Sequence, residues 1–155
     1  SIGQLAFTLI ELLVVISIIG LLATLVMANF NAARERSRDT QRKSDARNIQ
    51  TALRLYYNDF GEFPASSVAD DEINGCGADG ESTCDWGDSF ETNDQTYMTI
   101  LPADPSPDRS YRYEALAIDD SYTLKACLEN KSDEKCGPNE IWCSNLEGCV
   151  YLVQP

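Results

Sequence analysis

An unbroken apolar run near the start of the chain most constrains its fold. From Leu12 to Ala28 there is no charged residue, and between Phe7 and Phe30 the only ionisable side chain is Glu11. About 20 apolar residues in a helix span the hydrocarbon core of a bilayer, so the run predicts a membrane helix. A cleaved signal peptide is the alternative, but its apolar core is usually shorter and ends at a small-residue cleavage site. This run continues into a charged segment of helical character.

Glu11 is unusual in such a segment. A carboxylate inside a membrane helix is energetically costly and is usually functional or paired. One interpretation leaves Glu11 solvated at the membrane interface, and the other gives it a role in assembly. The residues around it favour the second.

Residues 7–23, which read FTLIELLVVISIIGLLA, closely resemble the N-terminal segment of type IV pilins and of the pseudopilins of type II secretion systems. In that family a prepilin peptidase cuts just before a Phe, the new Phe amine is methylated, and a Glu stands four residues further on. The resemblance implies cleavage between Ala6 and Phe7, with residues 1–6 as a leader remnant. The family usually has Gly where this chain has Ala6.

The resemblance also implies that Phe7 and Glu11 act in subunit assembly. If Glu11 of one subunit meets the Phe7 amine of a neighbour, two charges are compensated within a stack of apolar helices. Apolar helices otherwise attract one another with little directional preference, so this pair would fix their register. Gly20 is the expected weak point at which the helix unwinds on assembly.

The charge of the chain changes sign along its length. Residues 34–54 carry a net charge of +4, residues 55–155 carry −16, and the whole chain carries −13. We interpret the basic stretch as a solvated helix face; the alternative is pairing with the acidic domain of a neighbouring subunit. The acidic balance repels polyphosphate, so we expect no specific binding of nucleic acid.

The sequence does not indicate an enzyme. It contains no histidine, which excludes Ser-His-Asp catalysis and His-ligated zinc or haem. No nucleophile–base pair, phosphate-binding loop or metal-ligand motif is visible either.

The expected fold class is α+β, with a long N-terminal helix packed on a small antiparallel sheet. No Pro interrupts the chain between Phe7 and Phe60, so one helix is predicted, hydrophobic over residues 7–30 and amphipathic over 31–63. Gly61 and Pro64 predict the end of this helix. Residues 64–155 form an acidic globular β domain with a long surface loop at 65–96. Alternating patterns predict two hairpins, with strands at 110–118, 122–128, 140–143 and 149–153.

Six cysteines, all beyond residue 75, indicate disulfides formed outside the cytosol. Basic residues after a membrane helix would by themselves place the following domain in the cytoplasm, and the cysteines argue against that. Short local loops favour the pairings Cys76–Cys84, Cys127–Cys136 and Cys143–Cys149, with Cys127–Cys149 as a competitor. No C-x-x-C spacing for a zinc site occurs.

Calcium is the one candidate cofactor. Acidic loop residues offer the oxygen ligands that this ion prefers, and the resemblance to major pseudopilins implies a calcium site in the loops of the sheet. The candidate ligands are Asp104, Asp108, Asp119 and Asp120. An acidic solvated surface explains the same residues, and no other cofactor is expected.

The resemblance implies a structural subunit that polymerises through its N-terminal helix into a type IV pilus. It would be a helical filament of identical subunits, drawn from the cytoplasmic membrane by the pilus assembly machinery after prepilin peptidase has acted. A major pseudopilin of a type II secretion system is the alternative, favoured by Ala28, where many pilins have Pro, and by the segment 101–105 (LPADP). A membrane-tethered extracytoplasmic binding module is the other alternative, and it leaves Glu11 unexplained.

Overall fold

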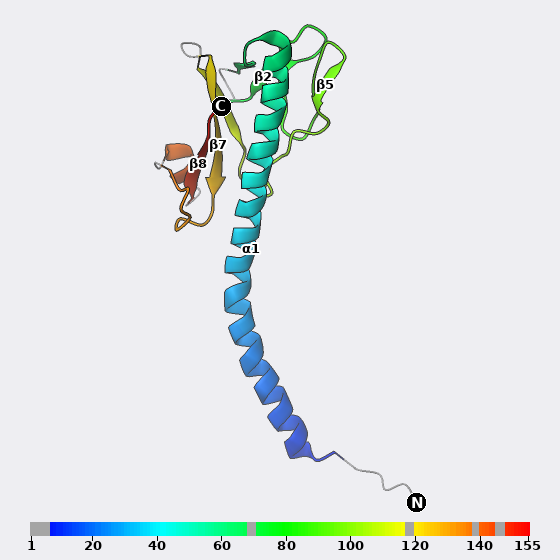
Figure 1. Cartoon of the computed structure of the whole chain (residues 1–155). Helices are drawn as coiled ribbons and strands as arrows, with labels where there is room; N and C mark the ends of the chain where they lie inside the picture. The colour runs from blue at the N-terminus through cyan, green and yellow to red at the C-terminus, as the bar shows by residue number, and fades with distance from the viewer. Residues whose placement is uncertain (1–6, 68–70, 117–119, 138–139, 145–147) are drawn as a thin grey trace, which may run out of the picture. The chain divides into compact units, whose positions relative to one another are not determined.

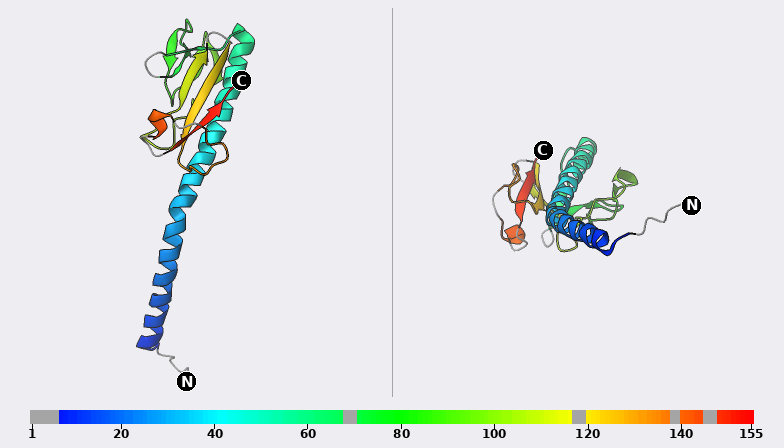
Figure 2. Two further views of the ribbon diagram at one scale, coloured as in Figure 1. Left: turned by 90° about the vertical axis from the view of Figure 1, so that its left-hand side faces the viewer. Right: turned by 90° about the horizontal axis from the view of Figure 1, so that it is seen from below.

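The computed structural model describes residues 7–67, 71–116, 120–137, 140–144 and 148–155. The chain divides into two compact units, one ending at Arg36 and the other running over Ser37–Pro155, and each is described by itself. Helix α1, Leu9–Phe60, supplies residues to both units. The expected α+β fold with a long N-terminal helix is confirmed, and Figures 1 and 2 show its elements.

Helix α1 ends where the sequence places a helix stop. Gly61 adopts a φ of 75°, a left-handed conformation that glycine takes without steric cost, and its N–H donates to the carbonyl of Tyr57 at 2.8 Å. Pro64 follows three residues later. The chain therefore turns back beside the helix at this point and enters the β domain.

The largest sheet packs against the second half of α1 within the second unit (Figure 2). It consists of β6 (Arg112–Leu116), β7 (Ser121–Leu128) and β8 (Cys149–Val153), antiparallel and in that order. The alternation predicted for β7 is confirmed, because every second residue of this strand joins the core between sheet and helix. From the sheet these core residues are Tyr113, Tyr122, Leu124, Ala126, Leu128, Cys149 and Tyr151, and from α1 they are Ala46, Ile49, Ala52, Leu53 and Tyr56.

The predicted surface loop at 65–96 contains more structure than the sequence indicated. It forms two small antiparallel sheets with the residues after it: β1 (Ala65–Ser66), β2 (Ile73–Cys76) and β3 (Ser82–Cys84), then β4 (Phe90–Thr92) and β5 (Gln95–Met98). The strands are only two to four residues long, too short for an alternating pattern to stand out. Their apolar residues, including Ile73, Phe90 and Tyr97, are nevertheless buried in the main core.

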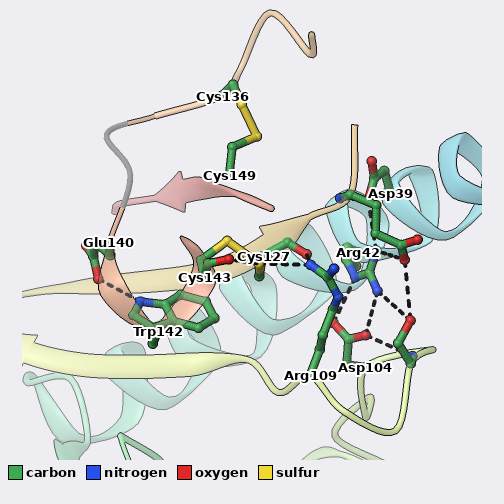
Figure 3. The surroundings of a disulfide bond; sticks show 12 residues. Asp39, Arg42, Asp104, Arg109, Cys127, Cys136, Glu140, Trp142, Cys143 and Cys149 are labelled. Atoms are coloured by element: carbon green, nitrogen blue, oxygen red, sulfur yellow. Dashed lines mark hydrogen bonds and ion pairs between the residues drawn. A yellow bond between two sulfur atoms is a disulfide. The ribbon is translucent and has the colours of Figure 1, made fainter. Parts of the chain in front are cut away.

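Two of the three predicted disulfides are wrong. The structure pairs Cys76 with Cys84, as expected, but it pairs Cys127 with Cys143 and Cys136 with Cys149 (Figure 3). The pleat of the sheet explains the difference. Cys149 lies opposite Leu128 and faces the helix, whereas Cys127 lies opposite Val150 and faces away from it. Side chains on opposite faces of a sheet cannot bond, which also excludes the competitor Cys127–Cys149.

The strand predicted at 140–143 is also wrong. Residues Ile141–Ser144 form a short helix, α2, which places Cys143 on the outer face of the sheet beside Cys127. The Trp142 side chain packs there as well, and its Nε1 donates to Glu140 at 2.7 Å. A four-residue helix leaves little periodic signal in a sequence, so the short apolar run looked like a strand.

A buried arginine joins α1 to the β domain. The Arg42 side chain is fully buried, and its Nε and Nη2 each donate to Asp104 at 2.8 Å (Figure 3). Its Nη1 donates to Asp39 and to Glu129, both at 2.8 Å. Arg38, one turn earlier, also pairs with Glu129. Two guanidinium groups thus share three carboxylates in a site largely closed to water, where charge pairing is least screened.

The interpretation of the basic stretch as a solvated helix face is therefore wrong for these residues. Arg42 is inaccessible, and Lys43 pairs with Asp133 of the β domain. Asp39 also forms hydrogen bonds to the backbone of the β domain. Its two carboxylate oxygens accept the backbone N–H groups of Glu129 and Asn130 at 2.9 and 2.8 Å. The charged residues hold the helix in register against the segment after β7.

The ion network shifts the pKa values of its members. Hydrogen bonds from Arg38 lower the pKa of Glu129 from 4.5 to about 2; burial acts in the opposite direction, and Arg42 contributes further to the lowering. Burial disfavours the charged form of Arg42, but its hydrogen bonds to Asp104 and Glu129 outweigh this and raise its pKa.

Glu129 should make the free energy of unfolding depend on pH in the acidic range. Because its pKa is depressed on folding, its contribution is fully present above about pH 4.5 and is lost as the pH falls towards about 2. We expect Glu129→Gln to lower the free energy of unfolding by roughly 3 kcal/mol at neutral pH. The measurement is denaturant unfolding of the full chain in detergent micelles, followed by near-UV circular dichroism at a series of pH values.

The control for this experiment is Glu134→Gln, which removes the same charge from an exposed position. We expect this variant to change the unfolding free energy by less than about 0.5 kcal/mol. The difference between Glu129→Gln and the unaltered chain should close between pH 4.5 and 2. A difference that stays constant over that range would contradict the role given to the Glu129 charge.

Candidate functional site

The first half of α1 presents an apolar surface that no other part of the described chain covers. Its large side chains are mostly half to four-fifths exposed, with Leu9 at 85% and Phe7, just before the helix, at 82%. By length and composition α1 is able to cross a membrane. So large an apolar surface requires a lipid or protein partner to keep it from water.

The few polar side chains of this segment do not interrupt its apolar surface. Ser17 and Thr24 donate their hydroxyls to the carbonyls of Leu13 and Leu21, both at 2.7 Å, and Asn29 donates to Leu25 at 3.2 Å. Each group therefore satisfies its hydrogen bond on its own helix, as polar side chains must in a medium without water. The outer surface is left to aliphatic side chains.

Glu11 caps the start of the helix that contains it. Its Oε2 accepts the backbone N–H of Thr8 at 2.9 Å and the Thr8 hydroxyl at 2.7 Å, while the Glu11 N–H donates back to the Thr8 oxygen at 3.3 Å. This reciprocal arrangement is a capping box, in which Thr-x-x-Glu satisfies amide groups that the first helical turn leaves unpaired. Thr8 was not among the predicted site residues, although the Thr-x-x-Glu spacing of a capping box is present in FTLIE.

The cap uses only one of the two carboxylate oxygens of Glu11. Oε1 makes no hydrogen bond to any residue that the structure describes. The carboxylate lies at a shallow hollow lined by the apolar residues Phe7, Ile10, Val14 and Val15. This geometry provides one oriented anionic acceptor inside an apolar surface, which is suited to a single cationic donor from another molecule. Ala6, on the other side of the expected cleavage point, lies outside the described residues.

Gly20 lies within α1, and a Cβ added to it would meet no atom within 4 Å. The fold of the single chain therefore does not need a glycine there. Unwinding of the helix at Gly20 on assembly stays a prediction.

The structure does not gather the described calcium candidates, Asp104, Asp108 and Asp120, into a group placed to hold a metal ion. Asp104 is buried and paired with Arg42, and the Oδ1 of Asp120 accepts the backbone N–H of Phe63 at 3.4 Å. Asp108 is exposed, and Asp119 lies outside the described residues. Within the described ranges, no group of three or more acidic or cysteine side chains is placed to hold a metal ion. Asp104 is instead used in an ion pair, and Asp120 accepts a hydrogen bond from the backbone of the segment after α1.

Comparison with known proteins gives two matches. Residues 3–27 match the family described as the prokaryotic N-terminal methylation motif. The chain is also similar to the type II secretion system core protein G of Pectobacterium carotovorum subsp. carotovorum, with 36% identity over 63 residues. The aligned part covers 41% of this chain and 40% of the relative, so the chain spans well under half of that protein's length. No solved structure matches the chain.

The two matches bear out the resemblance to type IV pilins and type II secretion pseudopilins, and the family match covers residues 7–23, on which the resemblance rests. This is a family of structural subunits, and neither match indicates catalysis. The methylation motif and the apolar helix also fit anchoring in a membrane before assembly.

The capping box gives a prediction about the start of α1. Thr8→Val keeps the shape of the side chain but removes the hydroxyl, and we expect it to destabilise the first turn by about 1 kcal/mol. The measurement is amide hydrogen exchange of residues 9–12 in detergent micelles, which should become faster. Thr8→Ser keeps the hydroxyl and serves as the control. Equal exchange rates in the two variants would contradict the cap.

Proposed function

We propose that the chain is a structural subunit that polymerises through the apolar half of α1 into a helical filament. The observation that supports this most directly is the apolar surface of residues 9–30 with the single carboxylate of Glu11 at its start. An isolated membrane anchor needs the apolar surface and a cap at the helix start, but it has no use for the second carboxylate oxygen of Glu11, which the cap leaves without a partner among the described residues.

Polymerisation gives the apolar surface a second environment besides the bilayer. Lipid tails and neighbouring helices are similarly apolar, so moving the helix from lipid into a bundle of identical helices costs little hydrophobic free energy. The preference for the bundle must then come from close packing and from polar contacts with a defined geometry. Within the described part of this segment, Glu11 supplies such a contact.

In this proposal, the two oxygens of Glu11 have different tasks. Oε2 is held by Thr8 and keeps the side chain oriented, while Oε1 receives the amine of Phe7 from a neighbouring subunit after cleavage before Phe7. Charge-assisted hydrogen bonds of this kind are stronger than neutral ones. Because each subunit carries one amine and one carboxylate, its carboxylate can pair with one neighbour and its amine with another, so the contact can repeat from subunit to subunit.

The filament that we favour is a type IV pilus on the cell surface. Three disulfides in the second unit suit a domain that stays folded outside the cell. A major pseudopilin of a type II secretion system is the second candidate, favoured by the similarity to the protein named type II secretion system core protein G. In both cases the subunit is structural, and we expect neither catalysis nor a bound cofactor.

The intact mass of the protein in material sheared from cells separates these candidates. We expect a chain that begins at methylated Phe7 in the sheared fraction, together with three intact disulfides. Recovery only from membranes, with the same processed start, would favour the pseudopilin. A chain still carrying residues 1–6 in its assembled form would contradict processing before Phe7.

Substitution of Glu11 tests the assembly step. Glu11→Gln retains a residue that fits a capping box but removes the charge, and Glu11→Ala removes both. We expect both variants to fold and to insert into membranes, and both to lower the yield of filaments more than about tenfold, because each subunit loses one charged hydrogen bond. Electron microscopy and pelleting of assembled material give the yield.

The matched control is Glu35→Gln, which removes a carboxylate from α1 after the apolar run. This variant should assemble as the unaltered chain does. If Glu11→Gln assembled equally well, the charge of Glu11 would have no part in assembly.

A further inference from the structure

One side of the second unit carries a concentration of negative charge. Residues 79–94, called here the acidic flap, contain six exposed acidic residues and no basic one: Asp79, Glu81, Asp85, Asp88, Glu91 and Asp94. The flap is held rigidly. The Cys76–Cys84 disulfide fixes its first part, and Asn93 and Asp94 both adopt positive φ values in the two-residue turn between β4 and β5. Its charges are therefore presented without a large ordering cost.

A second surface of the same unit is positive. Arg47 and Arg54 stand two turns apart on α1, both exposed, and neither forms an ion pair with any residue that the structure describes. Lys43 and Gln50 lie on the same side of the helix by their spacing. Lys43 pairs with Asp133, and Gln50 donates to the backbone carbonyl of Gln154 at 2.8 Å. Arg47 and Arg54, called here the basic edge, therefore lie on the flank of α1 beside β8.

The acidic flap lies on the other flank of the helix. Asp59 accepts the hydroxyl of Tyr97, a residue of β5, at 2.8 Å, and Asp45 accepts that of Tyr111 at 2.8 Å. Figures 1 and 2 show β5 and β8 on opposite sides of the part of α1 that belongs to this unit. The flap of a chain therefore does not reach its own basic edge.

The helix face next to the basic edge is suited to close approach of another molecule. Over residues 37–51, the exposed residues of this face are small or uncharged and include no carboxylate: Ser37, Gln41, Ser44, Asn48 and Thr51. An acidic surface that docks on Arg47 and Arg54 would meet no like charge on this face.

We propose that the basic edge of one subunit binds the acidic flap of a second copy of this chain. The proposal rests on the filament function above and names a lateral contact between the β domains of neighbouring subunits. The two surfaces are different and lie on opposite flanks, so their association is heterologous and continues from copy to copy. Complementary charges select this docking geometry over others, because most other pairings of an acidic domain bring like charges together.

Two charge-reversed variants of the full chain test the contact. In the first, Arg47→Glu and Arg54→Glu make the basic edge acidic, and in the second, Glu81→Lys and Glu91→Lys make part of the flap basic. All four side chains are exposed, so both variants should fold, which near-UV circular dichroism and the mass of the disulfide-bonded chain will check. Lys131→Glu is a control that reverses an exposed charge outside both surfaces.

The assay is the assembly of each processed protein on removal of detergent, with filament yield measured by pelleting and electron microscopy. We expect each reversed variant alone to give at least about tenfold less filament, and the Lys131→Glu control to assemble normally. An equimolar mixture of the two variants should restore assembly, because each reversed edge then meets a reversed flap. The filaments formed should contain both variants in equal amounts.

The outcomes separate this proposal from the one on which it rests. If both variants assemble normally while Glu11→Gln does not, the filament function stands and the lateral contact is wrong. If each variant fails and the mixture also fails, the two surfaces do not bind each other and the contact is again wrong. If the unaltered chain forms no filaments even in cells that carry the prepilin peptidase and the pilus assembly machinery, both proposals fail. The double variant Arg47→Gln, Arg54→Gln, which neutralises the basic edge, should give a filament yield between those of the unaltered chain and the charge-reversed variant. A normal yield from it would contradict the contact.

Discussion

The apolar surface of α1 over residues 9–30 has no partner among the residues that the structure describes, and the other features of the molecule depend on this. Residues 9–30 bury none of their large side chains against other described residues, so their stability must come from lipid or from other copies. This requirement explains why Ser17 and Thr24 bond to their own helix and why one carboxylate is held by Thr8 at the helix start. A polar group on such a surface must have its partner built in or supplied by a neighbour.

In the second unit, the same helix must instead be held in a defined position against a small sheet. Apolar packing alone defines the helix position poorly, since apolar contacts are non-directional. The bonds from Arg42 to Asp39, Asp104 and Glu129 have fixed directions and lengths, so only one register satisfies them. Burying these charges adds little net stability. Burial of these charges instead makes one register of the helix specific, because a shifted helix would leave several charges unpaired.

The sequence predicted those parts of the molecule that depend on local periodicity. The helix, its stop at Gly61 and the inner face of β7 follow from spacing that is visible along the chain. The pairing of Cys127 with Cys143 does not follow from local spacing, because it depends on which face of the sheet each residue occupies. The burial of Arg42 does not follow from local spacing either, because its three carboxylate partners come from distant segments as well as from α1. The capping box at Thr8, which was not predicted, depends only on the local spacing Thr-x-x-Glu and is therefore visible in the sequence.

Segregated charge limits how copies of this chain can assemble. Residues 55–155 carry −16 and residues 34–54 carry +4, and part of that positive charge is already neutralised by the chain's own Glu129, Asp104 and Asp133. Side-by-side domains in a filament would repel one another at distances below the screening length of about 8 to 10 Å. In the proposed filament, packing of the apolar helices would bring the domains that close. An offset in which the remaining exposed arginines of one copy face the acidic loops of the next would relieve this repulsion, and this offset, as much as helix packing, would determine the symmetry of the polymer.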